Sequence, residues 1–240
     1  MLRKVLLVVG GLSLGASALQ AQMMAVPPLP NAPFQAVNTL SITDGNGTRV
    51  VSGKIARNSD GSVYQESWKP GASEPEQIFI VDEPNHRFIQ LFPEKKLYTI
   101  RTNPNLSALK APTVTAAQQI QQAEQAKPKH IERAGLVQDV QPLGKKDIEG
   151  VVVIGELTTN RKPGVGMEDT ESSTEKWTSP DLQLPLLTKT HDARSKTDSV
   201  STMSRVSREE PDPSLFRIPD GYQSSSPKPA EPQASAPASH

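Results

Sequence analysis

Four histidines are the candidates for metal binding or proton transfer in this sequence. His86, His130 and His191 lie within the chain, and His240 is its last residue. None has a second histidine three or four residues away, the spacing that places two imidazoles on one side of a helix. The chain also has no cysteine, which excludes a thiolate site. The sequence therefore predicts no metal site and no cofactor.

Hydrolysis would need a serine or a pair of carboxylates in a defined setting. The Gly-x-Ser-x-Gly sequence that exposes a nucleophilic serine is missing. The acidic residues Glu171, Glu175, Glu209 and Glu210 are interpreted as solvated residues of strands and turns, not as a glycosidase pair. We predict no catalytic residue. A serine, a histidine and an aspartate that meet only by folding leave no local motif, so an exported hydrolase stays an alternative.

Short glycine and lysine motifs are better explained by turns than by ligands. Residues 45–47 (GNG) and 164–166 (GVG) lack the further glycine or lysine of a phosphate loop. Residues 46–48 (NGT) match a glycosylation sequon, but a hairpin turn accounts for them. The pairs Lys95-Lys96 and Lys145-Lys146 each precede a predicted strand. Their expected role is to oppose aggregation or to form a solvated rim.

Aromatic side chains are the remaining route to a binding surface. They make up 4% of the chain, and a domain with so few rings usually places them in its core. A core position is therefore favoured over an aromatic groove, and no ligand-binding residue is assigned. The rings concerned are Trp68, Phe79, Phe88, Phe92, Tyr98, Trp177 and Tyr222.

The N-terminus has the pattern of a cleavable signal peptide. Arg3 and Lys4 precede a short apolar run that ends in small residues. Cleavage after Ala21 is preferred to cleavage after Ala18. We expect a signal peptide over residues 1–21, an extracytoplasmic protein that is periplasmic or secreted, and no membrane anchor once the peptide is removed.

Charge limits the classes of partner. The chain has 26 basic and 26 acidic residues, and removal of two basic residues with the signal peptide would leave a charge of −2. Nucleic acids and anionic membrane surfaces reward a basic stripe, which the sequence lacks. We therefore expect no nucleic-acid partner, and consider a lipid or an envelope protein instead. The oligomeric state is not indicated.

The two ends of the exported chain contain little core material. Residues 22–33 form a proline-rich leader, and residues 223–240 form a tail of proline, serine and alanine without a large apolar residue. Such segments bury too little surface to offset the entropy of ordering, so both are expected to be disordered. Residues 34–222 are expected to form a single β-rich domain.

The first part of that domain, residues 34–103, has the pattern of a β meander. Turn sequences such as DGNG and NSDG separate runs that recur every 8 to 12 residues or so. The six predicted strands cover residues 34–44, 48–57, 62–68, 77–82, 87–92 and 97–102.

A linker with one helix follows at residues 104–134. Residues 113–126 are rich in alanine and glutamine, Thr113 or Thr115 can cap them, and Pro128 ends the pattern. The helix is expected to lie loosely over the sheet, with a solvated crossover as the alternative. The apolar residues on one face are Ala116, Ile120 and Ala123.

Residues 135–222 are predicted to form a second β segment. Residues 151–154 are apolar on both faces, which favours a central, covered strand, and residues 211–216 form a short helical turn. The fold class is therefore α+β, mainly β: a curved antiparallel sheet, or half-open barrel, with one light helix between two β segments. The predicted strands are 136–140, 146–159, 168–178, 182–191 and 197–208.

Several blocks of the sequence resemble a group of uncharacterised exported bacterial proteins. More distantly, the layout resembles the lipoprotein-carrier and lipoprotein-sorting proteins, which implies a curved sheet with covering helices and an apolar groove. One departure is that QESW, residues 65–68, stands where the group often has a more basic stretch. The matching blocks are residues 53–66, 78–82, 144–151, 175–187 and 207–222.

These observations favour a non-enzymatic exported protein. Its expected role is to bind a lipidic or apolar group, or an envelope partner, on the concave face of the sheet. An interaction module that acts through its disordered tails is a second hypothesis, and the exported hydrolase is a third.

Overall fold

The computed structural model describes residues 26–102, 114–133, 135–164, 166 and 170–225. The expected signal peptide and residues 226–240 of the expected tail lie outside the described residues. So do residues 103–113 of the linker and Val165 of the GVG motif. None of the helices in the described part of the chain combines the length and apolar character needed to cross a membrane.

The described chain is a sheet of thirteen strands with one α-helix. In the first half the strands are β1 (Phe34–Asp44), β2 (Gly47–Arg57), β3 (Val63–Ser67), β4 (Gln77–Asp82), β5 (Arg87–Phe92) and β6 (Leu97–Thr102), with the 3₁₀ turn η1 (Pro93–Lys95). Helix α2 (Ala116–Gln125) follows. The second half has β7 (Lys129–Arg133), β8 (Leu136–Ile148), β9 (Val151–Arg161), β10 (Ser172–Ser179), β11 (Leu184–Asp192), β12 (Thr197–Ser207), the 3₁₀ turn η4 (Pro213–Phe216) and β13 (Gln223–Ser224).

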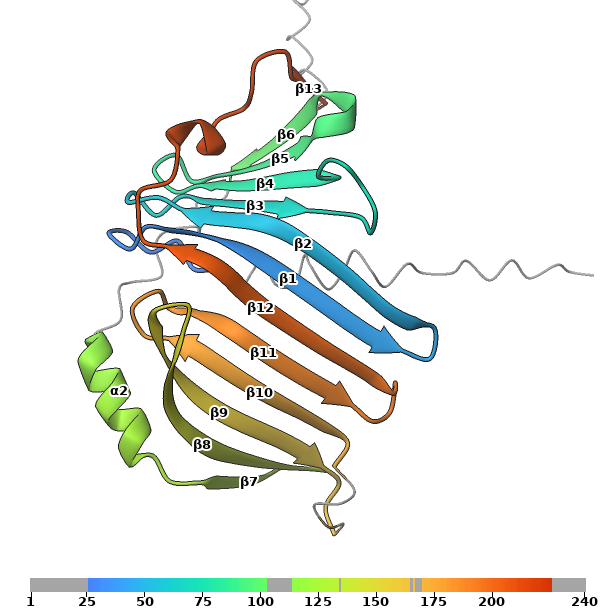
Figure 1. Ribbon diagram of the computed structural model, residues 1–240, viewed down its shortest axis with the longest axis vertical. Coiled ribbons are helices and arrows are strands. Elements are labelled where there is room, and N and C mark those ends of the chain that lie inside the picture. The colour runs from blue at the N-terminus through green and yellow to red at the C-terminus, as the bar shows by residue number, and fades with distance from the viewer. Residues whose placement is uncertain (1–25, 103–113, 134, 165, 167–169, 226–240) are drawn as a thin grey trace, which may run out of the picture.

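Two antiparallel meanders share this sheet. β1 to β6 and β7 to β12 each follow the chain order, and β1 pairs with β12 to join them (Figure 1). β13 adds a short parallel pairing beside β6. The expected curved antiparallel sheet, with a light helix between two β segments, is confirmed. The six strands predicted before residue 103 match the six observed ones.

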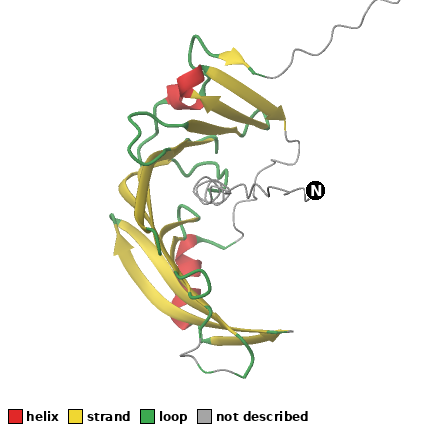
Figure 2. Cartoon of the chain, turned by 90° about the vertical axis from the view of Figure 1, so that its right-hand side faces the viewer, coloured by secondary structure: helices red, strands yellow, loops and turns green. Residues whose placement is uncertain are grey.

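The sheet bends into an open arc with an inner and an outer face (Figure 2). Residues that face each other on neighbouring strands have their side chains on the same side of the sheet, so the strand register shows which residues share a face. One inner row runs from Leu40 through Ser201, Thr188 and Lys176 to Glu156. Helix α2 lies on this inner side, whereas η4 lies on the outer side (Figure 2).

The larger core cluster gathers around the junction of the two meanders. A fully buried arginine, Arg57, lies beside it and donates to the backbone oxygens of Ala32 at 2.9 Å, Pro27 at 3.0 Å and Leu182 at 3.0 Å. The guanidinium also lies 5.1 Å from the ring centre of Phe34. The cluster comprises Val26, Phe34, Ala36, Ile55, Val63, Val151, Val153, Trp177, Leu182, Leu184, Leu186 and Met203.

A second cluster lies on the outer face of the first meander. It consists of Ala56, Tyr64, Ile80, Ile89 and Leu91, with residues of η4 and the following segment packed against it. Phe216, Ile218 and Tyr222 belong to this covering layer. The core therefore consists of two clusters, one around the junction of the meanders and one on the outer face of the first meander.

The proline-rich leader is a correction to the sequence-based expectation. Residues 26–33 were expected to be disordered, yet Val26, Leu29 and Ala32 are buried against the sheet. Arg57 holds two of the leader's carbonyl groups, which compensates for the segment's poor apolar content. The ordered chain therefore begins before residue 34.

The second meander differs from prediction in its turns. A strand was predicted over residues 146–159, but Glu149 and Gly150 both have positive φ and form a hairpin turn between β8 and β9. Val152 is 41% exposed, so residues 151–154 are not covered on both faces. β7 was not predicted, and Gln223 and Ser224, expected in the disordered tail, pair with β6.

Candidate functional site

A groove of about 310 Å³ lies between α2 and the inner face of β8, β9 and β10. Its size is at the lower end of the range for small-molecule sites. α2 supplies one wall and the sheet supplies the floor. The lining residues are Ala123, Ala126, Lys127, Lys129, Val140, Pro142, Ile154, Gly155, Glu156, Lys176 and Thr178.

The sequence of α2 explains why it covers the sheet without filling the space beneath it. Thr115 caps the helix: its hydroxyl accepts from the Gln118 amide at 3.3 Å, and Gln118 Oε1 accepts from the Thr115 amide at 3.0 Å. No residue of α2 is fully buried, and the wall positions Ala123 and Ala126 carry only methyl groups. The expected loose packing of this helix on the sheet is confirmed.

Polar contacts link α2 to the sheet and to the β10–β11 loop. Lys145 Nζ lies 2.6 Å from Glu124 Oε1 on the helix. Nearer the N-terminal end, Gln183 Nε2 donates to Gln119 Oε1 at 3.3 Å. Exposed contacts of this kind are each worth about 1 kcal/mol or less. The helix is therefore held over the groove by weak contacts.

The floor of the groove contains apolar residues and lies beside an irregularity in β8. Val140, Pro142 and Ile154 line the groove. The β8–β9 register shifts between Pro142 and Gly144, and Gly144 has φ +80°, which non-glycine residues rarely adopt. Proline lacks an amide hydrogen and suits such a break in the strand pairing. Pro142 shares the inner face with Val140, and the bulge follows directly after it.

Charged residues surround the apolar floor with an excess of positive charge. Lys127, Lys129 and Lys176 line the groove, against a single acid, Glu156. Lys176 Nζ lies 3.4 Å from Glu156 Oε1. Within the described residues, Lys127 and Lys129 have no carboxylate within 4.0 Å. The groove can therefore hold an apolar chain and place an anion at its edge.

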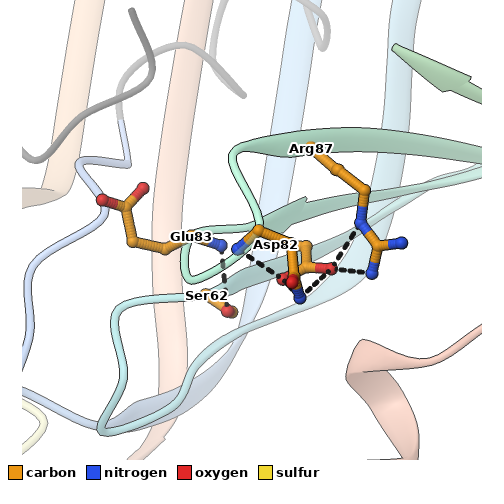
Figure 3. Close-up of polar contacts among 5 residues, drawn as sticks. Ser62, Asp82, Glu83 and Arg87 are labelled. Atoms are coloured by element: carbon orange, nitrogen blue, oxygen red, sulfur yellow. Dashed lines mark hydrogen bonds and ion pairs between the residues drawn. The ribbon is translucent and has the colours of Figure 1, made fainter. Parts of the chain in front are cut away.

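A second polar cluster, at the turn between β4 and β5, tests the hydrolase hypothesis (Figure 3). The Asp82 carboxylate accepts from Asn85 Nδ2 at 2.8 Å and from the Arg87 guanidinium. Ser62 Oγ accepts from the Glu83 amide at 3.2 Å. These contacts fix the turn and leave Ser62 without a histidine partner among the described residues. The cluster is a structural one.

The candidate histidines are dispersed. His86 is exposed in the β4–β5 turn, and His240 lies outside the described residues. His130 Nδ1 lies 2.6 Å from Asp139 Oδ1, and this hydrogen bond is the largest cause of the lowered pKa of Asp139. His191 Nδ1 lies 2.7 Å from an exposed aspartate of β12. Among the described residues, no three metal-ligating side chains gather.

The candidate carboxylates do not form a pair either. Arg194 and then Lys162 hold the pKa of Glu171 below its usual value. The pKa of Glu175 is lowered chiefly by the hydrogen bond from Trp177 Nε1, at 2.6 Å. The other two candidates, Glu209 and Glu210, are exposed after β12, and Glu210 accepts from the Ser59 amide at 2.9 Å.

The aromatic residues do not line the groove. Phe79 and Trp177 are buried, and the other candidates are partly buried. Trp177 packs on Gly155, where a Cβ would lie 2.6 Å from the ring, and Lys146 Nζ lies 3.7 Å from the ring centre. Lys145 and Lys146 were expected to precede a strand, but both lie within β8. Lys145 forms an ion pair with Glu124 of α2, and Lys146 lies over the ring of Trp177.

The glycine motifs behave as turns. Residues 45–47 connect β1 to β2, where the Asp44 side chain accepts from the Asn46 amide at 2.8 Å. Lys96 has positive φ at the end of η1, just before β6. None of these places contributes to the groove.

No family model and no curated protein matches this chain. Among solved structures it is similar to an uncharacterized conserved protein from Thermus thermophilus, with 11% identity, a TM-score of 0.45, and coverage of 86% of this chain and 98% of the other. It is also similar to a LolA superfamily protein from Nitrosomonas europaea, with 9% identity, a TM-score of 0.38, and coverage of 85% and 98%. The MucA/MucB complex of Pseudomonas aeruginosa matches with 10% identity, a TM-score of 0.36, and coverage of 85% and 60%.

These neighbours agree with the resemblance found in the sequence. They include an uncharacterized conserved protein and a LolA superfamily protein. All three TM-scores are below 0.5, so none of them adds to the case for a function.

An apolar groove was expected from the resemblance, but the residues that line it were not predicted, because they come from four separate segments of the chain. One local signal was available: Pro128 lies between the end of α2 and the start of β7, and it is flanked by Lys127 and Lys129. This position in the sequence places both lysines where the helix meets the sheet.

Proposed function

We propose that this chain is an exported, non-enzymatic binding protein that takes the apolar chain of an amphiphile into the groove beneath α2. The observation that carries the proposal is the groove itself, about 310 Å³ with an apolar floor of Val140, Pro142 and Ile154. Pockets for small molecules combine an apolar lining with a few placed polar groups, and this groove has that composition.

The dimensions of the groove favour one acyl chain over two. Its volume lies near the lower limit for drug-sized ligands. Burial of an acyl chain gains about 0.8 kcal/mol per methylene group, so a chain of moderate length suffices for micromolar binding. The leader bound by Arg57 covers another part of the inner face, near the junction of the meanders. The space beneath α2 is thus a bounded site on that face.

Export is part of the proposal and is supported by the sequence of residues 1–21. A basic start, a short apolar run and small residues are the pattern of a cleavable signal peptide. The polar cluster of Ser62 and Asp82 makes hydrogen bonds within the β4–β5 turn, which supports a structural role for it. An acyl ligand in the compartment outside the cytoplasm is the function that the groove fits best.

The test is direct titration of the full chain with dodecanol, measured by calorimetry. Ala123→Phe places a ring in the groove from a helix that has no buried residue, so folding is expected to be retained. We expect binding of dodecanol to weaken at least about tenfold, a change of about 1.4 kcal/mol. Far-UV circular dichroism checks the fold.

The matched control is Gln122→Phe, one residue earlier on the exposed side of the same helix. It adds the same ring without entering the groove, so dodecanol affinity should stay at the wild-type value. Equal weakening by both variants, or no binding of dodecanol to the wild-type chain, would refute the proposed site.

A further inference from the structure

We infer that the groove selects a single-chain amphiphile with an anionic head group, held at the edge of the groove by Lys127 and Lys129. The inference rests on the proposed function, because the head group is placed by the chain that the groove binds. It concerns the chemistry of the ligand, which the apolar floor alone leaves open.

The charge balance of the lining residues is the first step. Three lysines and one glutamate line the groove, and the Lys176–Glu156 pair at 3.4 Å accounts for one charge of each sign. The neighbouring Lys145–Glu124 pair, at 2.6 Å, is also neutral as a unit. Lys127 and Lys129 remain, so the edge of the groove carries an excess of two positive charges.

The end of α2 does not reverse this sign. A helix carries roughly half a negative charge at its C-terminus, and α2 ends at Gln125, beside the groove. Against two lysine charges this leaves the edge positive. An amphiphile with a cationic head would be repelled there, and one with an anionic head would be attracted.

The backbone fixes where the two lysines lie relative to the floor. Lys129 faces Val140 across the β7–β8 pairing, so its side chain lies on the same side of the sheet as this floor residue. Lys127 follows the C-cap of α2 and lies on the helix side of the same opening. A ligand chain on the floor would therefore bring its head group near two ammonium groups that come from one segment, where α2 connects to β7.

Both lysines are exposed, which sets the size of the effect. Exposed ion pairs are individually weak and are screened by salt. Two of them together would strengthen the binding of an anionic amphiphile about three- to tenfold over a neutral one at low salt. The preference should shrink as the salt concentration rises.

The experiment compares four ligands on the full chain by calorimetry at low and high salt: dodecanoate, dodecanol, dodecyltrimethylammonium and inorganic phosphate. We expect dodecanoate to bind about three- to tenfold more tightly than dodecanol, and the difference to fall in high salt. Dodecyltrimethylammonium, the cationic amphiphile, should bind most weakly of the three amphiphiles. Inorganic phosphate alone should not bind measurably, because it has no chain to hold it.

The double variant Lys127→Gln, Lys129→Gln should remove the preference for dodecanoate over dodecanol, so that the two amphiphiles bind with equal affinity. The matched control is Lys95→Gln, Lys96→Gln, an exposed lysine pair next to β6 that does not line the groove. This control should keep the preference. The charge-conserving double variant Lys127→Arg, Lys129→Arg should also keep the preference for dodecanoate.

The outcomes separate this inference from the proposed function. Equal affinities for dodecanoate and dodecanol, or a preference that survives the glutamine variant, would overturn the anionic head group and leave the groove as an acyl site. Phosphate that binds as tightly as dodecanoate would overturn the amphiphile and indicate a simple anion site. If none of the three amphiphiles binds the protein, both proposals are overturned.

Discussion

Arg57 allows a quantitative prediction, because it is a fully buried charge whose hydrogen-bonding partners are carbonyl groups. Its guanidinium joins the leader, through Pro27 and Ala32, to the β10–β11 loop, through Leu182. The substitution Arg57→Met keeps a long, flexible side chain and removes all three donors. We expect it to destabilise the domain and to release residues 26–33.

The magnitude follows from two opposing contributions. Two buried carbonyl oxygens and one that is partly buried lose a charged donor, at about 2 kcal/mol each, so the loss is about 6 kcal/mol. The pKa of Arg57 is lowered to about 10, chiefly because burial disfavours the charged form and then because of Arg208. That lowering corresponds to a penalty of about 3 kcal/mol, which the neutral methionine does not have. The net expected loss of unfolding free energy is about 3 kcal/mol.

Urea denaturation measures this loss. With a slope of about 1–3 kcal/mol per molar urea, the midpoint should fall by about 1–3 M. Amide exchange in residues 26–33 should accelerate before the global transition, because the leader depends on Arg57 most directly. The matched control is Arg49→Met on the same strand, whose exposed pair with Asp44 should contribute under about 1 kcal/mol. A loss below 1 kcal/mol for Arg57→Met, or equal losses for both variants, would refute the assigned role.

Three further predictions concern single residues. Gly155→Ala should destabilise the domain by about 1–3 kcal/mol in urea denaturation, because its Cβ would lie 2.6 Å from Trp177, whereas Gly45→Ala, which meets nothing within 4 Å, should change stability little. Thr115→Ala should remove about 1 kcal/mol of cap stability, seen as faster amide exchange in α2 with an unchanged global midpoint. The lowered pKa of Glu171 stabilises the fold above the ordinary value of 4.5, and this contribution is lost as pH falls through the lowered pKa. Melting temperatures of Glu171→Gln should therefore depend less on pH below 4.5 than those of the wild-type chain.

Strand positions could be predicted from the sequence because their signals are local. Alternation and turn residues are enough to locate β1 to β6, including the DGNG hairpin turn between β1 and β2. The prediction failed at residues 149 and 150, where the first turn position is glutamate, a residue that rarely adopts positive φ. The Asp147 side chain, which accepts from the Gly150 amide at 2.9 Å, supports this turn.

The long-range features could not be predicted in the same way. The pairing of β1 with β12 joins residues more than 150 positions apart, and no local pattern specifies it. The leader is ordered by Arg57, whose sequence context on β2 gives no sign of three carbonyl partners. Composition alone indicated disorder for residues 26–33, because it counts apolar residues and cannot count a buried hydrogen-bonding network.

The groove and the free edge of the sheet are connected through Lys129. β7 ends the sheet, and an exposed edge strand invites pairing with other chains unless charged residues oppose it. Lys129, His130, Glu132 and Arg133 are charged or ionisable residues of this strand, and all four are exposed. Lys129 both protects the edge and lines the groove, so the proposed head-group site lies where the sheet stays open to solvent. A closed barrel would remove the edge and, with it, the entrance through which an anionic amphiphile could reach the floor.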